Sequence, residues 1–514
     1  MIGSTDFAAA AKACRHLLRH LHQPAALHLN PLLRAQLNGT PTPAAVRDLI
    51  EALAAGIPER ERAIVLRCDL ERQPHKTVAR DLGLSMRQFY RDRGAMIDRL
   101  ALQLVERTNR HQIYAAVIDV AALEAARARL LQYGGHRETA VTLLRGIAAS
   151  AASLDDSVAA RCAVAGIFTE QNSIAAAEAE LHEVARALAE TPSVTALAFE
   201  RMQHERRNML WCSGREREAC LLDEAAAPRI AALAASDDAA SRHFAAGALT
   251  MLARRAFMCG RFILARELLE RAHHVLTLQE DTPIDTRIHW LLLDGVVRAT
   301  LRTGASRSKI AQAGDVAVKH GLSELAVLAA IGLSIEEQMH GAHAAAFDHV
   351  HRVVPLARTV ASALNRSHVF LRLGEMQAQL GRPHAALAAL AEARAAVPIK
   401  NYAWTYNNLI AARTHLVLHE YETAKDYALS AAEAAATQRN ERTEGTALMA
   451  LAESYVGLNA TSAAVGAIES SIVRLERSGY PLVLMNAYRI GARLTGRRHY
   501  TRFAEELEQL MKSA

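Results

Sequence analysis

The chain has 514 residues, of which 51% are hydrophobic and only 5% aromatic, and its formal net charge is +6. This length exceeds what a single compact core organises, so several domains or an array of repeats is expected. Alanine and leucine dominate the composition, which favours helices packed on helices and argues against a β-rich class.

The sequence contains no long run of uncharged apolar residues and no basic head followed by an apolar core at its start, so neither a membrane span nor a secretory signal is expected. The six cysteines are scattered without a CxxC pair, which is typical of reduced thiols in helix cores. We therefore expect a cytoplasmic protein that does not associate with membranes.

The positive charge is confined to one end of the chain. Residues 1–110 contain 17 Lys and Arg against 11 Asp and Glu, whereas residues 111–514 contain 43 of each. A polyanion would be attracted to the N-terminal segment, and added salt would weaken that attraction.

Four helices are predicted before residue 75. The first covers residues 6–22, the second begins at Pro31, the third runs from Pro43 to a stop at Gly56, and the fourth begins at Pro58. Their inward positions at helical spacing are Phe7, Cys14, Leu17, Leu18 and Leu21, then Val46, Leu49, Ile50 and Leu53, then Ile64, Val65, Leu66 and Leu70. His16, His20 and His22 have no carboxylate nearby, and a metal ion needs a full shell of ligands, so no metal site is expected.

Residues 75–100 predict a helix-turn-helix. Val78, Ala79 and Leu82 form the apolar face of a short first helix, and Gly83 supplies a turn that tolerates positive φ. Ser85 can cap the second helix, which Phe89 would anchor. Such a helix fits the major groove of DNA, where arginine reads guanine and glutamine reads adenine.

The candidate DNA-binding residues follow from this placement. Arg87, Gln88 and Arg91 would read base edges, while Lys76, Arg80 and Arg93 would position the domain on phosphates. Ser85 and Tyr90 complete the predicted contact set. The alternative interpretation is an ordinary amphipathic helix pair whose arginines are a solvated face.

The segment Glu59–Leu100, which contains ERERAIVL, TVARDLGLS and QFYRDR, resembles the DNA-binding part of sigma-factor region 4 and related bacterial regulators. Ala79, Gly83, Leu84 and Ser85 fall where that family has its turn, and Phe89 falls at its apolar anchor. The departures are Asp92 and Arg93, where an apolar residue is usual, and Gly94 inside the recognition helix. The resemblance covers under a tenth of the chain and implies a bacterial transcription regulator.

From about residue 124 the chain repeats itself. In the clearest unit, Phe370, Leu373 and Gly374 lie on a first helix, and Ala386, Leu390 and Ala393 lie on a second. With its turn at Gly381 and its closing Pro398, this unit resembles the tetratricopeptide repeat, although Gln377 replaces the expected tyrosine. A second unit shares the spacing through Leu249, Leu252, Gly260, Phe262, Ala265, Leu269 and Ala272.

Candidate turn residues recur about every 40 residues, which is longer than the usual tetratricopeptide unit and predicts a solenoid of helical hairpins. They are Gly135, Asn172, Gly214, Gly260, Gly304, Gly341, Gly381, His419 and Asn459. The final helices, from Ala487 to Met511, would close the array. We thus expect an all-α chain with a helix-turn-helix domain at 1–110 and a tetratricopeptide-like superhelix at 111–514.

The inner face of such an array commonly binds an extended peptide or a partner helix. Arg254, Glu375, Tyr406 and Arg413 are the candidate partner-binding residues, and ordinary solvated positions are the alternative for each. No phosphate-binding loop, dinucleotide turn or nucleophile elbow occurs, so neither an enzymatic activity nor a cofactor is expected.

The combination predicts a regulator that binds double-stranded DNA and whose repeats sense a ligand or peptide or bind a protein partner. A change in solenoid curvature, passed through a short junction near residue 110, would couple the two functions. The alternative is a repeat scaffold whose basic domain docks on RNA polymerase or another protein instead of DNA. The sequence leaves open whether the protein forms a homodimer.

Overall fold

The computed structural model describes residues 14–15, 17–18, 21, 43–107, 120–151, 153–277 and 282–513. Every regular element in these residues is a helix, which confirms the expected all-α class. The chain divides into two compact units, Met1–Leu131 and Gln132–Ala514, which we describe separately. The predicted junction near residue 110 lies outside the described residues.

The first unit is a small helical domain built around one apolar core. Its elements are α4 (Pro43–Ala54), α5 (Glu59–Ile64), the π-helical turn η1 (Val65–Leu70), α6 (His75–Asp81) and α7 (Met86–Arg107). Predicted inward residues of three segments meet in the core, including Cys14, Leu17, Leu18, Leu21, Val46, Ile50, Leu53, Ile64, Val65 and Leu70. The rest of the helix predicted at 6–22, the one predicted from Pro31 and the three histidines of that region lie outside the described residues.

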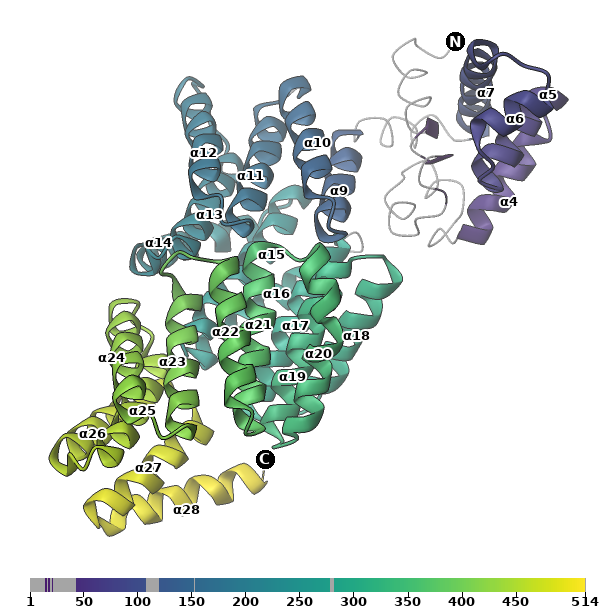
Figure 1. Cartoon of the computed structure of the whole chain (residues 1–514). Coiled ribbons are helices and arrows are strands. Elements are labelled where there is room, and N and C mark those ends of the chain that lie inside the picture. Colours follow the sequence, from purple (N-terminus) through teal and green to yellow (C-terminus); the bar gives the residue numbers. More distant parts are fainter. Residues whose placement is uncertain are drawn as a thin grey trace. The chain divides into compact units, whose positions relative to one another are not determined.

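The second unit is a stack of antiparallel helical hairpins (Figure 1). The helix α9 (Val120–Tyr133) spans the boundary between the units, and it is joined through the turn at Gly135 to α10 (Arg137–Ser150). The hairpins are α11 (Leu154–Glu170) with α12 (Ile174–Ala189), α13 (Ala196–Cys212) with α14 (Glu216–Ala234), α15 (Ala239–Met258) with α16 (Phe262–Thr277), α17 (Ile284–Leu301) with α18 (Ser306–Lys319), α19 (Ser323–Met339) with α20 (His343–Val360), α21 (Ala363–Gln379) with α22 (Pro383–Ala396), α23 (Tyr402–Val417) with α24 (Tyr421–Thr437), α25 (Glu441–Gly457) with α26 (Thr461–Ser478), and α27 (Pro481–Thr495) with α28 (Arg498–Ser513).

The predicted turn residues fall between the paired helices. Eight of the nine adopt positive φ, from 58° at Asn459 to 92° at Gly135. At Gly304 the left-handed residues are instead its neighbours Arg302 (φ 54°) and Ala305 (φ 68°). The repeat period read from the sequence is therefore the period of the structure.

Small residues let the two helices of a hairpin approach closely. A Cβ atom added at Gly374 on α21 would lie 3.0 Å from Leu390 Cδ2 on α22. Alanine or glycine is needed at such a contact because interiors are already close-packed. The alanine-rich composition therefore positions the helices as well as favouring them.

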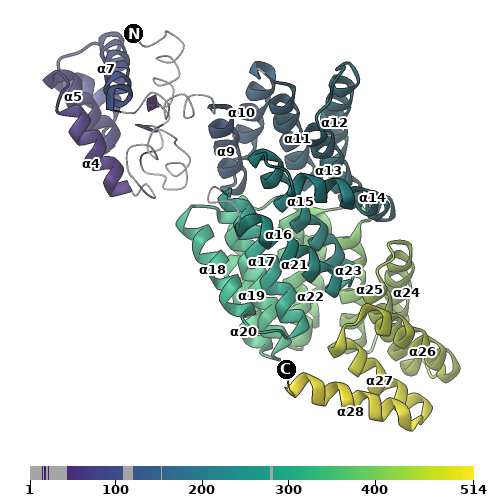
Figure 2. The same cartoon turned by 180° about the vertical axis from the view of Figure 1, so that it is seen from behind.

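The array also winds onto itself, so hairpins far apart in sequence touch (Figure 2). Asn401, at the start of α23, donates through Nδ2 to the Cys212 carbonyl at the end of α13, and Asn440 donates in the same way to Met258. Both bonds are 2.9 Å long and join hairpins five repeats apart. Gly214 fits this contact because a Cβ there would lie 2.4 Å from the Lys400 carbonyl oxygen.

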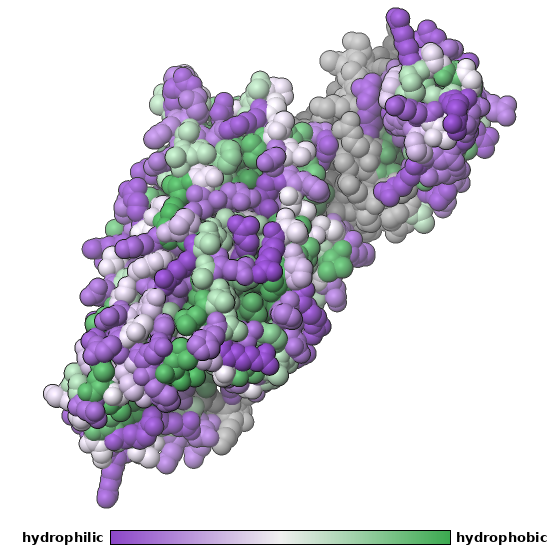
Figure 3. All heavy atoms as spheres, in the orientation of Figure 1, coloured by the Kyte–Doolittle hydropathy of each residue, from purple (hydrophilic) through white to green (hydrophobic). Residues whose placement is uncertain are grey.

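The face shown in Figure 3 mixes hydrophilic residues with small groups of hydrophobic ones. Of the described helices, none combines the length and apolar character needed to cross a membrane. The described cysteines are present as free thiols.

Candidate functional site

The first two turns of α7 carry an exposed basic face. Arg87 and Arg91 lie one turn apart, and both are exposed, with the Arg91 side chain 76% accessible. Because successive helical residues are separated by about 100°, Gln88 and Tyr90 lie on the two flanks of this face. Asp98 follows on the same face and pairs with Arg15 at 3.7 Å, so the basic character ends within α7.

Buried neighbours fix this face in place. Phe89 points the other way and is completely buried, as are Val78 and Ala79 on α6. Gly83 adopts φ 64° in the turn, and the Ser85 hydroxyl accepts a 3.2 Å hydrogen bond from the Gln88 amide. The turn, the cap and the anchor predicted for residues 75–100 are thus confirmed.

Two further predicted phosphate contacts are available on α6. Lys76 and Arg80 lie one turn apart and both are exposed. The Arg80 side chain is 80% exposed and lies 3.5 Å from Asp81, which is itself paired with Arg67 at 2.5 Å. Such solvent-exposed contacts are weak, so a phosphate can compete for Arg80.

Arg93 differs from the other predicted DNA contacts. It points toward the domain and forms a 2.6 Å ion pair with the buried Asp69 of η1, which leaves its side chain 22% exposed. The adjacent Asp92 is buried and pairs with Arg60 at 2.9 Å. Asp92 and Arg93, at positions where the sigma-factor family carries apolar residues, therefore form ion pairs with α5 and η1. Helix α7 continues through Gly94 to Arg107.

Three of the four candidate partner-binding residues form one network inside the repeats. The buried Glu375 accepts hydrogen bonds from Arg372 at 2.6 Å and from Tyr406 at 3.0 Å, and Arg413 lies 3.8 Å away. Burial raises the pKa of Glu375, but the charges of Arg372 and Arg413 outweigh it and lower the pKa overall. Glu375 and Tyr406 are thus engaged in joining α21 to α23.

The fourth, Arg254, lies in a different cluster. It approaches the hydroxyl of Tyr402, and its charge also acts on Glu170, His289 and His368. We call these residues and Tyr133 the Arg254 cluster; its members come from α9, α11, α15, α17, α21 and α23. All except the buried Tyr402 are half-buried, so solvent reaches the place where these helices converge.

Hydrogen bonds organise the cluster into pairs. The Tyr402 hydroxyl lies 2.8 Å from His368 Nε2, and the Tyr133 hydroxyl lies 3.2 Å from His289 Nε2. The Gln132 amide donates to Glu170 at 3.1 Å. Each imidazole therefore faces a phenol, which can donate to an uncharged ring nitrogen.

Burial shifts the pKa values of the titratable groups around Arg254 toward their neutral forms. It lowers the pKa of His289 to about 4 and that of His368 to about 3, and the charge of Arg254 adds to both shifts. Burial and the charge of Glu324 raise the pKa of Glu170 to about 7. At neutral pH the two imidazoles are therefore uncharged, Arg254 keeps its positive charge and Glu170 is partly ionised.

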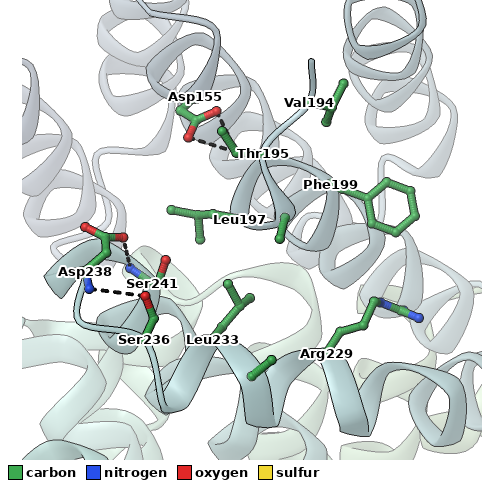
Figure 4. A pocket seen from close by; sticks show the side chains of 12 residues that line it. Asp155, Val194, Thr195, Leu197, Phe199, Arg229, Leu233, Ser236, Asp238 and Ser241 are labelled. Carbon is green, nitrogen blue, oxygen red and sulfur yellow. Dashed lines mark hydrogen bonds between the residues drawn. The ribbon is translucent and has the colours of Figure 1, made fainter. Parts of the chain in front are cut away.

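A separate pocket of about 720 Å³ lies between the start of α13 and helices α14 and α15 (Figure 4). Leu197 and Leu233 point into it, but its polar groups already have partners. Thr195 donates to Asp155 at 2.9 Å, Asp238 caps α15, and Arg229 pairs with Glu200 at 2.7 Å. We therefore assign no ligand to this pocket.

Arg254 was a candidate from the sequence, whereas its neighbours in the cluster were not: Tyr133, Glu170, His289, His368 and Tyr402. Each lies on a different helix. Tyr133 and Glu170 both lie two residues before a turn residue, but His289, His368 and Tyr402 lie at other distances from theirs, so no single spacing marks the set. Their association depends on the winding of the array. Across the described residues, no group of three or more His, Cys, Asp or Glu side chains is placed to hold a metal ion.

No family model matches this chain, and no curated protein matches it. Solved structures of helical repeat proteins are similar to it. A Rap protein complexed with competence and sporulation factor is 15% identical, with 69% of this chain and 99% of that chain covered and a TM-score of 0.47. Aspartyl phosphate phosphatase F from Bacillus subtilis is 12% identical, with 70% and 93% covered and a TM-score of 0.39.

A signal transduction ATPase with numerous domains and a tetratricopeptide repeat sensor, from Pyrococcus horikoshii, is 12% identical over 88% of this chain and 72% of that chain, with a TM-score of 0.37. At these identities and scores the similarities carry no functional information. The helical solenoid is evident from the stacked hairpins themselves.

Proposed function

We propose that this chain is a DNA-binding transcription regulator whose repeats sense a ligand or peptide or bind a protein partner. The observation that carries the proposal is the exposed face of Arg87 and Arg91, which the buried Phe89 holds on the first turns of α7. An α-helix of this kind fits the major groove, where arginine donates two hydrogen bonds to guanine.

Charge supports the same assignment. Lys76 and Arg80 extend the exposed basic surface from α7 to α6, and residues 1–110 carry the whole positive excess of the chain. We assign base reading to Arg87, Gln88 and Arg91, with Tyr90 beside them. Phosphate contacts are assigned to Lys76, Arg80 and the exposed Ser85, while Arg93 supports α7 through Asp69. The proposal includes no catalytic step.

The full-length chain tests this proposal by selection from a pool of random DNA duplexes, followed by affinity measurement at several salt concentrations. We expect retained duplexes to share a sequence, and the affinity to fall steeply between about 50 and about 200 mM salt. Arg87→Ala should weaken discrimination at one base pair by about 1 to 3 kcal/mol.

Arg47→Ala is the matched control. Arg47 is an exposed residue of α4 paired with Glu51 at 3.1 Å, so its loss changes the net charge equally without touching the α7 face. If Arg87→Ala weakens base-pair discrimination no more than Arg47→Ala does, Arg87 does not read a base. Absence of duplex retention at low salt would instead favour a scaffold whose basic domain docks on RNA polymerase or another protein.

A further inference from the structure

Arg254 is a half-buried arginine that, within the described part of the chain, has no ion pair. Its neighbour Arg255 shows the usual arrangement, because Asp223 and Asn208 accept hydrogen bonds from it at 2.6 and 2.7 Å. A guanidinium keeps its charge at any ordinary pH and offers five N–H donors. Arg254 thus places a permanent charge where several first helices converge, and the one carboxylate in its cluster is Glu170, whose pKa burial raises to about 7.

The surroundings of Arg254 favour an anion. His289 and His368 are uncharged and already face Tyr133 and Tyr402, so they neither repel an anion nor compensate it by charge. Arg137, the other arginine acting on Glu170, is paired with the buried Glu324. A partly desolvated charge is costly unless it is paired, and a bound anion would supply the missing partner.

We propose that the Arg254 cluster binds a single carboxylate group, carried by a small organic acid or by the C-terminus of a short peptide. One guanidinium matches one carboxylate through two parallel hydrogen bonds. A phosphate dianion is less suited to the cluster because Arg254 is its only cationic member. The flanking phenols and imidazoles provide neutral hydrogen-bonding groups beside the carboxylate. This inference specifies the class of ligand that the repeats would sense, and it rests on the proposal that the repeats have a sensory function.

Equilibrium dialysis of the full-length chain tests the inference without DNA. The probes are a randomised pentapeptide pool with free C-termini, the same pool amidated, benzoate, and inorganic phosphate, with retained compounds identified by mass spectrometry. We expect retention of free-carboxylate peptides or of benzoate, whichever is the source, and no retention of the amidated pool.

Arg254→Gln should reduce the affinity for the retained carboxylate at least about tenfold, and Arg254→Lys should reduce it less, since lysine keeps the charge but loses the paired donors. Arg287→Gln, at an exposed position of α17, removes the same charge and should leave binding unchanged. Circular dichroism of each variant checks that it is folded.

Retention of no carboxylate probe would overturn the inference, and so would equal retention of the amidated pool or of phosphate. An Arg254→Gln variant that is folded and binds normally would do the same. Failure of the inference is distinguishable from failure of the DNA-binding proposal, because duplex selection depends on Arg87 and carboxylate retention on Arg254.

Discussion

Asn401 donates a 2.9 Å hydrogen bond from Nδ2 to the carbonyl oxygen of Cys212, which lies 189 residues earlier in the chain. Its other side-chain atom, Oδ1, accepts from the backbone amides of Ala403 at 3.0 Å and Trp404 at 3.4 Å. Asn401 is completely buried. One side chain therefore caps α23 and joins two hairpins five repeats apart.

Replacing Asn401 by alanine removes both functions. We expect Asn401→Ala to lower the free energy of unfolding by about 2 to 4 kcal/mol, because a cap is lost and the Cys212 carbonyl loses its donor. Asn401→Ser keeps an N-cap acceptor but is too short to reach Cys212, so it should lose about half as much. Urea denaturation measures both, and a Ser variant as stable as the wild type would show that the long-range bond contributes nothing.

Arg93 should matter for stability more than for DNA. Arg93→Ala removes a 2.6 Å partner from the buried Asp69 and should destabilise the α7 and η1 contact by about 1 to 3 kcal/mol. The exposed Arg87 has no buried partner comparable to Asp69, so Arg87→Ala should change the free energy of unfolding by less than about 0.5 kcal/mol. Amide hydrogen exchange in residues 65–100 compares the two variants, and equal protection in both would contradict this assignment.

Two helical glycines of neighbouring helices should respond oppositely to the same substitution. A Cβ at Gly445 on α25 would lie 2.7 Å from Leu475 Cγ, whereas one at Gly466 on α26 would meet nothing within 4 Å. Gly445→Ala should therefore cost about 1 to 3 kcal/mol through overpacking. Gly466→Ala should gain about 0.5 to 1 kcal/mol from helix propensity. Thermal unfolding reports both signs, and a stabilised Gly445→Ala would refute the close contact.

Burial at Glu216 makes stability depend on pH. Glu216 is 2% exposed, and burial raises its pKa from 4.5 to about 7. The folded state then binds the proton more tightly than the unfolded state, so this residue's contribution to stability falls as the pH rises from 4.5 to about 7. Glu216→Gln is uncharged throughout. Its stability relative to wild type should increase by about 3 kcal/mol across this range, and denaturation at both ends measures the difference.

Glu170 should make carboxylate binding at Arg254 depend on pH. Burial and the charge of Glu324 raise the pKa of Glu170 to about 7, although the Gln132 hydrogen bond and the charges of Arg137 and Arg254 lower it. Below that pH Glu170 is neutral, and above it the carboxylate competes with the ligand for Arg254. Affinity should therefore fall several-fold as the pH rises through 7, and Glu170→Gln should abolish the change. A wild-type affinity that is constant over this range would show that Glu170 does not compete.

The sequence predicted the local geometry of this fold well. Turns at Gly135 and Asn172 and the cap at Ser85 depend on backbone conformations that a few residue types favour, so they can be read without knowing what packs around them. The buried positions of α4 follow from helical spacing in the same way. These are properties of segments shorter than one hairpin.

Features that depend on the winding of the array could not be predicted. His289 and His368 join Arg254 only because first helices from several hairpins converge. Glu375 and Tyr406 were expected on an open inner face, but they bind each other. The superhelical geometry sets these contacts, and small rotations per hairpin accumulate beyond what a repeat pattern encodes.

Asn440 donates a hydrogen bond to the Met258 carbonyl, and the ring of Tyr480 packs 5.4 Å from that of Phe262. The last hairpins therefore stabilise early hairpins by direct contact. A solenoid with neighbour contacts alone can fray from its end one unit at a time. Here, trimming the C-terminal helices would loosen α15 and α16, more than 150 residues upstream. The array should melt as one block, and it should tolerate shortening far less than an open repeat protein does.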